Sequence, residues 1–393
     1  MQDLIEKAAE GLKLDRSDWK LVKFGDVAIQ QKKTVDRDNT ELTRYVKGEH
    51  MYSEDIHLRE WGELKDEYLG PAFIRKFEEG DILYGSRRTY LRKVVVAPFE
   101  GITSNTTFVI RANDKLIDKR LLPYLMLSEG FSQHSILNSK GSVNPYVNWK
   151  DLASYEFLLP PLEKQNEILQ LLELCSSALE SSKQLLERCQ KLVLAYRAEI
   201  FAVGKWKKAR LNDFFEVQLG KMLSAKSKLG LSPCKYLTNQ NIQWGRIVTT
   251  DLNEMDFDEK EKAKFELKSG DLLVCEGGDV GRTAIWRGEL ENCYYQKALH
   301  RLRSIDGKIL PEIMLQFMQW SSFCGTFRAL TGHTTIAHLT AIELKELKVP
   351  EIPREVQEYW KNKFEQAIDT ESKLSAQLDH LKKLKMSLIN QVF

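Results

Sequence analysis

The sequence lacks the features of a membrane protein and of a disulfide-bonded or zinc-stabilised fold. No apolar run approaches the roughly 20 residues that a helical bilayer span needs. The six cysteines form no CxxC pair and follow no regular spacing, which disfavours structural zinc and a disulfide framework. The N-terminus carries acidic residues early and has no apolar signal core. We therefore expect a cytoplasmic protein that makes no membrane contact.

Motifs that carry catalysis are also missing. An amino-methyltransferase needs an (N/D)-P-P-(Y/F) segment after a glycine-rich cofactor loop, but Asn144-Pro145-Tyr146 lacks one proline and no convincing cofactor loop precedes it. The glycine-rich stretch Gly277–Gly281 is not followed by Gly-Lys-Ser/Thr, so we interpret it as a tight turn between strands. The seven histidines form no HExxH motif, and His333 and His338 have no obvious metal partners. We expect no catalytic residue, no cofactor and no metal ion.

What is present is an ordinary globular composition on a long chain. The 393 residues are 42% hydrophobic and 29% charged, which suits two or three domains with substantial cores. The net charge of +2 neither requires nor excludes nucleic acid, because binding depends on local patches of charge.

The chain contains an internal repeat with an offset of about 190 residues. Four segments recur in the same order: Trp19–Val27 with Trp206–Phe214, Glu79–Tyr84 with Ser269–Val274, Leu122–Leu127 with Leu310–Leu315, and Leu158–Gln165 with Lys348–Gln357. A period this long indicates a duplicated domain rather than a solenoid.

Each half predicts short strands first and helices later. Val94–Val96 and Thr107–Ile110 are β-branched or aromatic runs in the first half, and Leu272–Val274 and Thr283–Trp286 take their place in the second. A short helix is expected after each Leu-Pro signal, and prolines then precede a change to helical periodicity. The predicted fold class is α+β, with two duplicated mixed domains.

A long helix is predicted after each proline cluster. The first shows a heptad seam at Ile168, Leu172, Cys175, Leu179, Ser182, Leu186, Cys189, Val193, Tyr196 and Ile200. The second shows Trp360, Phe364, Ala367, Glu371, Leu374, Leu378, Leu381, Lys385, Leu388 and Val392, where Glu371 and Lys385 interrupt the seam. We expect the two helices to form an antiparallel coiled coil. The alternative is that each helix packs separately on its own domain.

Loops rich in basic and amide side chains are the candidate binding surfaces. The candidates are Arg87, Arg88, Tyr90, Arg92, Lys93, Lys140 and Asn144 in the first half, and Lys221, Lys226, Lys228, Asn239, Asn241, Gln243, Arg246, His333, Thr334 and Thr335 in the second. Lys and Arg bind phosphates, whereas Asn, Gln and Arg can make bidentate contacts with adenine or guanine edges. Any single one of these charges is equally well explained as a solvated surface group, but the clusters favour DNA.

The duplicated halves, their proline-rich exits and the long helices resemble the specificity subunits of Type I restriction–modification systems. Lys235–Ile247 is similar to the family segment "YIR-x-x-NI-x-x-G-x-I", and Gly270–Ala284 is similar to its "GD-I-L…G-x-x-G" strand pair. Gly80–Lys93 and Ala97–Asn105 resemble the counterpart in the first half. The resemblance runs from about Trp19 to the end of the chain, but departs from the "YIR…NI" pattern around Tyr45–Tyr52.

The resemblance implies a domain plan and a role. Residues 1–160 are expected to form the first target recognition domain, with 1–18 as an N-terminal extension; residues 161–203 the first spacer helix; residues 204–352 the second target recognition domain; and residues 353–393 the second spacer helix. It implies that each domain reads half of a split double-stranded DNA target and that the helices set the spacing between the halves. It also implies that two methylation subunits and restriction-translocation subunits dock on the chain and supply the chemistry.

A coiled-coil adaptor that binds protein rather than DNA is the alternative. An autonomous methyltransferase or nuclease is disfavoured by the missing motifs.

Overall fold

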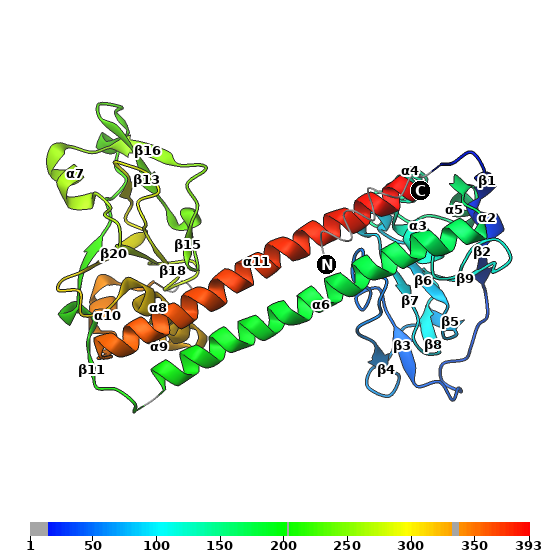
Figure 1. Ribbon diagram of the computed structural model, residues 1–393, viewed down its shortest axis with the longest axis horizontal. Helices are drawn as coiled ribbons and strands as arrows, with labels where there is room; N and C mark the ends of the chain where they lie inside the picture. The colour runs from blue at the N-terminus through cyan, green and yellow to red at the C-terminus, as the bar shows by residue number, and fades with distance from the viewer. Residues whose placement is uncertain (1–14, 203, 332–337) are drawn as a thin grey trace. The chain divides into compact units, whose positions relative to one another are not determined.

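The computed structural model describes residues 15–202, 204–331 and 338–393, which divide into two compact units. Unit 1 contains the chain up to Gln184 together with Ser375–Phe393, and unit 2 contains Leu185–Leu374. Both units mix helices and strands, as predicted (Figure 1). No helix among the described residues combines the length and the apolar character needed to cross a bilayer.

Unit 1 is built on two four-stranded sheets and a short strand pair. One sheet has the order β2-β9-β6-β7, the other has the order β4-β3-β8-β5, and β1 pairs with β10. The elements are β1 Lys20–Lys23, α2 Phe24–Val27, β2 Ala28–Gln31, β3 Arg44–Val46, β4 Gly62–Glu63, β5 Phe73–Phe77, β6 Ile82–Gly85, the 3-10 helix η1 Thr89–Leu91, β7 Val94–Val96, β8 Gly101–Ser104, β9 Thr107–Ala112, α3 Leu122–Leu127, α4 Glu129–Leu137, α5 Trp149–Ala153 and β10 Glu156–Leu159.

Unit 2 repeats most of this topology, but its second sheet has three strands in the order β16-β13-β19, where that of unit 1 has four, and β14 pairs with β15. The sheet β12-β20-β17-β18 has the same strand order as β2-β9-β6-β7, the parallel pair β13-β19 corresponds to β3-β8, and β11-β21 corresponds to β1-β10. The elements are β11 Lys208–Arg210, η2 Leu211–Asp213, β12 Phe215–Leu219, η3 Lys226–Lys228, β13 Pro233–Leu237, η4 Asn239–Asn241, β14 Ile242–Gln243, β15 Arg246–Ile247, β16 Asn253–Asp256, α7 Glu259–Phe265, β17 Leu272–Cys275, β18 Thr283–Ile285, β19 Tyr294–Tyr295, β20 Leu299–Ser304, α8 Pro311–Phe323, α9 Thr326–Thr331, α10 Ala341–Glu346 and β21 Lys348–Pro350. The duplication predicted from the sequence is confirmed.

The repeated Gly-Asp segments have a structural role. Asp81 is 2% exposed, and its carboxylate accepts hydrogen bonds from the Glu78 backbone N–H at 2.8 Å and from Arg111 Nε at 2.8 Å. Asp271, also 2% exposed, accepts from the Lys268 N–H at 2.8 Å and from Arg303 Nε at 2.7 Å. Each aspartate therefore closes the turn before a central strand and binds an arginine of the neighbouring strand. A buried carboxylate needs such partners.

The two long helices, α6 Leu162–Phe201 and α11 Arg354–Val392, pair within each unit. In unit 1, Ile168 and Leu172 of α6 share a core with Leu388 and Val392 of α11. In unit 2, Val193 and Ile200 of α6 share a core with Trp360 and Phe364 of α11. The start of α6 thus meets the end of α11, and the end of α6 meets the start of α11. The antiparallel pairing is confirmed, although the same cores also include residues of the strand-bearing domains.

A buried glutamine joins each long helix to its domain. The Gln165 side chain accepts from the Asp118 N–H at 2.8 Å and donates to the carbonyls of Leu116 at 3.0 Å and Pro160 at 2.9 Å. Gln357 makes the same three kinds of bond, to the Leu310 N–H and to the carbonyls of Lys308 and Ile352. Both residues are 0% exposed. These bonds fix where each helix leaves its domain.

Replacing Gln165 by Ala should lower the local free energy of unfolding by about 3 kcal/mol, because three backbone groups lose the hydrogen bond of a buried side chain at about 1 kcal/mol each. Native-state hydrogen exchange of β10 and the first turns of α6 measures this loss. Gln170→Ala, an exposed position on the same helix, is the matched control and should change little. Equal effects of the two substitutions would show that the buried bonds do not anchor the helix.

Candidate nucleic-acid interface

In the first domain, a short antiparallel ribbon is formed by the segment Lys140–Tyr146. The Lys140 N–H donates to the Tyr146 carbonyl at 2.8 Å, and the Tyr146 N–H donates back to the Lys140 carbonyl at 2.9 Å. Gly141 begins the turn with φ +91°, a conformation that glycine adopts without strain. Ser139, just before the ribbon, is bonded through its hydroxyl to the Ser135 carbonyl of α4 at 2.8 Å. The Lys140–Tyr146 ribbon is thus fixed at its base.

The ribbon is joined to the arginine-rich segment Ser86–Lys93. Arg87 pairs with Tyr146 through an antiparallel bridge, and the Arg88 N–H donates to the Pro145 carbonyl at 2.6 Å. The Val147 N–H donates to the Ser86 carbonyl at 2.9 Å. Two segments about 50 residues apart in sequence are therefore held as one surface.

Five of the seven residues predicted in this domain are exposed on this surface: Arg87, Arg88, Tyr90, Lys140 and Asn144. Neither Gly85–Lys93 nor Asn138–Lys150 contains Asp or Glu. One acidic group from outside lies within reach, since Asp151 Oδ2 is 3.7 Å from Lys140 Nζ. We name this set the ribbon surface; it combines cations, an amide and an aromatic ring, as a polyanion-binding site requires.

Arg92 and Lys93 are half-buried and have partners within the protein. Arg92 is ion-paired with Glu129 and, at 3.5 Å, with Glu54. Lys93 donates to the Gly48 carbonyl, and burial followed by the nearby Arg88 lowers the pKa of its ammonium group. These contacts favour a structural role for both residues over the predicted phosphate contact.

In the second domain, the predicted amide cluster Asn239–Gln243 is largely used inside the protein. Asn241 is 7% exposed; its Oδ1 accepts from Thr238 N and Oγ1 at 2.8 and 2.9 Å, and its Nδ2 donates to the carbonyls of Val248 and Asp251. Asn239 donates to the Gly277 carbonyl at 3.1 Å. Both atoms of the Asn241 amide are therefore used inside the protein, and the Asn239 amide oxygen is buried without a partner among the described residues. These contacts favour a structural role for both residues over the predicted base contact.

Gln243 and Arg246 lie on either side of a tight hairpin turn. They are paired in the β14–β15 register, across Trp244 and Gly245, and Gly245 has φ +72°. Arg246 is exposed, and Gln243 is half-buried with one bond to the Gln240 carbonyl at 3.1 Å. This hairpin is the described part of the second domain that best fits the predicted base-reading role.

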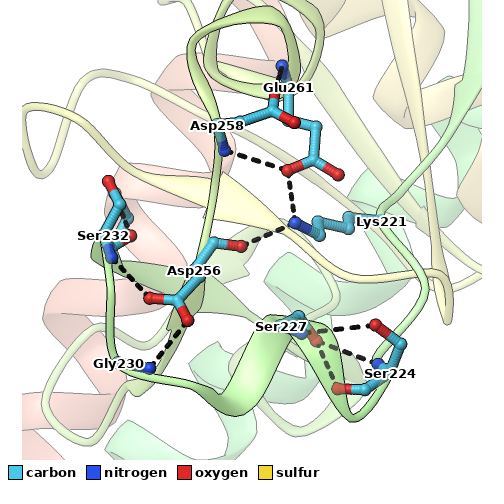
Figure 2. A network of polar contacts seen from close by, with 9 residues as sticks. Lys221, Ser224, Ser227, Gly230, Ser232, Asp256, Asp258 and Glu261 are labelled. Atoms are coloured by element: carbon cyan, nitrogen blue, oxygen red, sulfur yellow. Dashed lines mark hydrogen bonds and ion pairs between the residues drawn. The ribbon is translucent and has the colours of Figure 1, made fainter.

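Lys221 is the centre of an internal network rather than a free cation. Figure 2 shows its ammonium group between the Asp256 carbonyl, at 2.6 Å, and the Glu261 carboxylate. The Asp256 carboxylate in turn accepts from the N–H groups of Gly230 and Ser232 at 2.7 and 2.6 Å, which holds the pKa of this carboxyl below its ordinary value. The network fixes the loop that carries Lys228, which is exposed. Lys221 itself is positioned to stabilise this loop.

The remaining candidates lie outside the described residues or are explained by the fold. His333, Thr334 and Thr335 are outside the described ranges, as is the side chain of Lys226. Gly277–Gly281 forms the tight turn between the antiparallel strands β17 and β18, as predicted. Among the described residues, no group of three His, Cys, Asp or Glu side chains could hold a metal ion.

Two exposed residues of the ribbon were missed by the sequence analysis. Val143 is 92% exposed and Tyr146 is 43% exposed, beside Tyr90 at 54%. The Gly-Ser and Asn-Pro pairs that flank Val143 are turn signals, and they could have placed it at the tip of a loop.

Comparison with known proteins gives one consistent result. Residues 16–190 and 204–380 match the model of a family described as the Type I restriction modification DNA specificity domain. A curated relative, the Type I restriction enzyme EcoDI specificity subunit of Escherichia coli, is 28% identical over 166 residues, which span 40% of this chain and 34% of the relative. The MjaVIII specificity subunit of Methanocaldococcus jannaschii is 23% identical over 300 residues, which span 68% of this chain and 65% of the relative. The chain thus spans less than two thirds of the length of either relative.

Solved structures agree on the fold. A chain from a structure of the type I R-M system has a TM-score of 0.64 at 18% identity, over 95% of this chain and 97% of that one. The S subunit of a Type I restriction–modification system from M. genitalium has a TM-score of 0.60 at 14% identity, over 97% of this chain and 98% of that one.

Replacing Asn241 by Ala should lower the local free energy of unfolding in the second unit by about 3 kcal/mol, because the substitution leaves buried donors and acceptors unpaired. Gln243→Ala, two residues away but half-exposed, should change it by no more than about 0.5 kcal/mol. Hydrogen exchange of β13 and β16 measures both. An Asn241→Ala protein with unchanged exchange would return Asn241 to the list of candidate base-reading residues.

Proposed function

Because the chain belongs to the family of Type I restriction modification DNA specificity domains, we propose that it is the subunit that reads the DNA sequence for a multisubunit restriction–modification enzyme. Each of its two domains, within residues 1–160 and 204–352, reads one half of a split double-stranded target. The long helices, within residues 161–203 and 353–393, set the spacing of the two halves and dock two methylation subunits. Restriction-translocation subunits join the complete enzyme. The complex works in the cytoplasm, where its DNA is.

The observation that carries this proposal is the ribbon surface. Arg87, Arg88 and Lys140 offer three exposed cations beside the exposed amide of Asn144. Cations position a protein on the phosphates, and amides read base edges. In the second domain the corresponding role falls to the hairpin residues Gln243 and Arg246 and to Lys228, together with Lys226, His333, Thr334 and Thr335. Lys221, Arg92, Lys93, Asn239 and Asn241 are assigned to supporting these surfaces.

Catalysis is assigned to the partner subunits. Asn144-Pro145-Tyr146, the nearest match to a methyltransferase segment, forms one side of a ribbon whose backbone bonds go to Lys140, Arg87 and Arg88. These bonds support the proposal that the segment belongs to a binding loop. An adaptor that binds only protein is the alternative function, and it gives no reason for exposed cations in segments without acidic residues.

Substitutions on the two surfaces should have different effects when the chain is bound to its methylation subunits. Arg87→Ala combined with Arg88→Ala should weaken binding to every duplex and reduce the slope of log K against log salt by about 2, since each lost phosphate contact removes about 0.9.

Gln243→Ala combined with Arg246→Ala should relax discrimination at one half-site only, by about 1–3 kcal/mol for a lost bidentate contact. Gel-shift titrations against duplexes with either half-site altered give both numbers.

The control is Lys115→Ala, an exposed lysine of the first domain that lies outside the ribbon surface. It should leave affinity, salt slope and specificity unchanged. If the Gln243→Ala, Arg246→Ala variant lost discrimination equally at both half-sites, the proposal that each domain reads its own half-site would be refuted. Absence of sequence-specific binding with partners present would favour the adaptor.

The spacer proposal predicts a longer target gap when the helices are lengthened. Helix α6 has 40 residues, or about 60 Å, enough to serve half-sites about 34–36 Å apart. One heptad inserted near Ser182 with a matching heptad near Leu378 keeps the seam in register and adds roughly 10 Å, about three base pairs of rise. Selection from a library of spacer lengths should return the same half-sites with a longer gap and lower affinity, because the DNA must twist. An unchanged gap with binding intact would limit the helices to assembly.

A further inference from the structure

The tip of the Lys140–Tyr146 ribbon holds an apolar and an amide side chain out in solvent. Val143 is 92% exposed. Asn144 beside it is exposed, and its side chain has no hydrogen-bond partner among the residues that the structure describes. The backbone hydrogen bonds of Lys140, Tyr146 and Arg88 hold the base of the ribbon that carries both side chains. Val143 is not an isolated apolar group on this surface, because the exposed rings of Tyr90 and Tyr146 belong to the same two hydrogen-bonded segments.

A base-reading role for the ribbon tip points to the major groove of DNA, where each base pair presents a distinct pattern of chemical groups. The two segments of the ribbon are bridged in antiparallel fashion at Lys140 and Tyr146, as in a two-stranded ribbon. The major groove of B-DNA, about 12 Å wide, admits a two-stranded ribbon, whereas the minor groove is about 6 Å wide. Arg87 and Arg88 are joined to the base of the ribbon by the Arg87–Tyr146 bridge and the Arg88–Pro145 bond, and their exposed cations suit the phosphates that flank a groove.

The chemistry of the tip then selects the base pairs. The thymine C5-methyl group is the apolar feature that the four standard bases present in the major groove, and an asparagine amide pairs in bidentate fashion with adenine N6 and N7. We propose that the ribbon tip reads neighbouring A·T base pairs in the half-site of the first domain, an inference that rests on the proposed DNA-reading function. Val143 contacts a thymine methyl group and Asn144 binds an adenine edge. Val143 is thus a specificity-determining residue.

The test uses the full chain with its methylation subunits, after the methylated target has been mapped by sequencing. Each thymine of the first half-site is replaced singly by uracil, which removes only the methyl group. One replacement should weaken binding about fourfold, the effect of losing one buried methyl contact. Val143→Ala should weaken binding to the normal duplex by a similar factor and should no longer distinguish thymine from uracil at that position.

The control is Leu137→Ala, which removes another highly exposed apolar side chain close in sequence but outside the ribbon. It should keep the sensitivity to uracil. For the second contact, 7-deazaadenine removes N7 from one adenine at a time. One such replacement should weaken wild-type binding, and Asn144→Ala should lower discrimination at that pair on the order of 5- to 150-fold and abolish the effect of the analogue.

Four results would overturn the inference: a half-site without two adjacent A·T pairs, no thymine sensitive to uracil, a Val143→Ala variant weakened equally on all duplexes, or a variant that loses its methylation subunits instead of its DNA specificity. In each case, sequence-specific binding by the wild-type complex would leave the proposed function intact. Failure of the wild-type complex to bind any sequence specifically would instead refute the function itself.

Discussion

The structure depends on one repeated constraint, the buried glutamine that begins each long helix. Gln165 and Gln357 are fully buried, and each bonds one backbone N–H and two backbone carbonyls of its unit. The bonds join three parts of each unit: the loop before the short helices, the proline-rich exit and the long helix itself. These bonds set the direction in which each long helix leaves its domain, and therefore how it packs against the other long helix within the unit.

Hydrogen bonding within the protein also distinguishes the residues predicted to contact DNA. Some of their polar groups are bonded inside the protein, and others are exposed to solvent. Asn241 and Asn144 are both asparagines in loops rich in polar residues, yet Asn241 is enclosed by four hydrogen bonds and Asn144 has an exposed amide. Lys221 and Lys228 differ in the same way, since one is held by Asp256 and Glu261 and the other faces solvent. Internal residues of this kind have a function too, because they hold the loops that present the exposed ones. Binding loops need such support to keep their side chains in place.

The ribbon surface forms because folding brings together segments that are distant in the sequence. The arginines of Ser86–Lys93 and the ribbon Lys140–Tyr146 become one surface through the Arg87–Tyr146 bridge and the Arg88–Pro145 bond. Arg92 is instead ion-paired with Glu54 and Glu129, which come from two further segments, so it is not part of the ribbon surface. Neither relationship has a local signal in the sequence, because both arise from the packing of loops around the sheets.

The sequence by itself determined the α+β class, the duplication, the turn at Gly277–Gly281 and the antiparallel pairing of the helices. These features rest on periodicity, turn residues and repeated order, which act over a few neighbours or over whole halves of the chain. Only the tertiary structure decided that Asn241 and Lys221 are internal, that Lys385, which interrupts the seam, is buried beside the Tyr124 ring, and that Val143 stands at an exposed tip. The physical reason is that a polar side chain is internal or available according to the partners that folding brings to it, and those partners come from segments far away in the sequence.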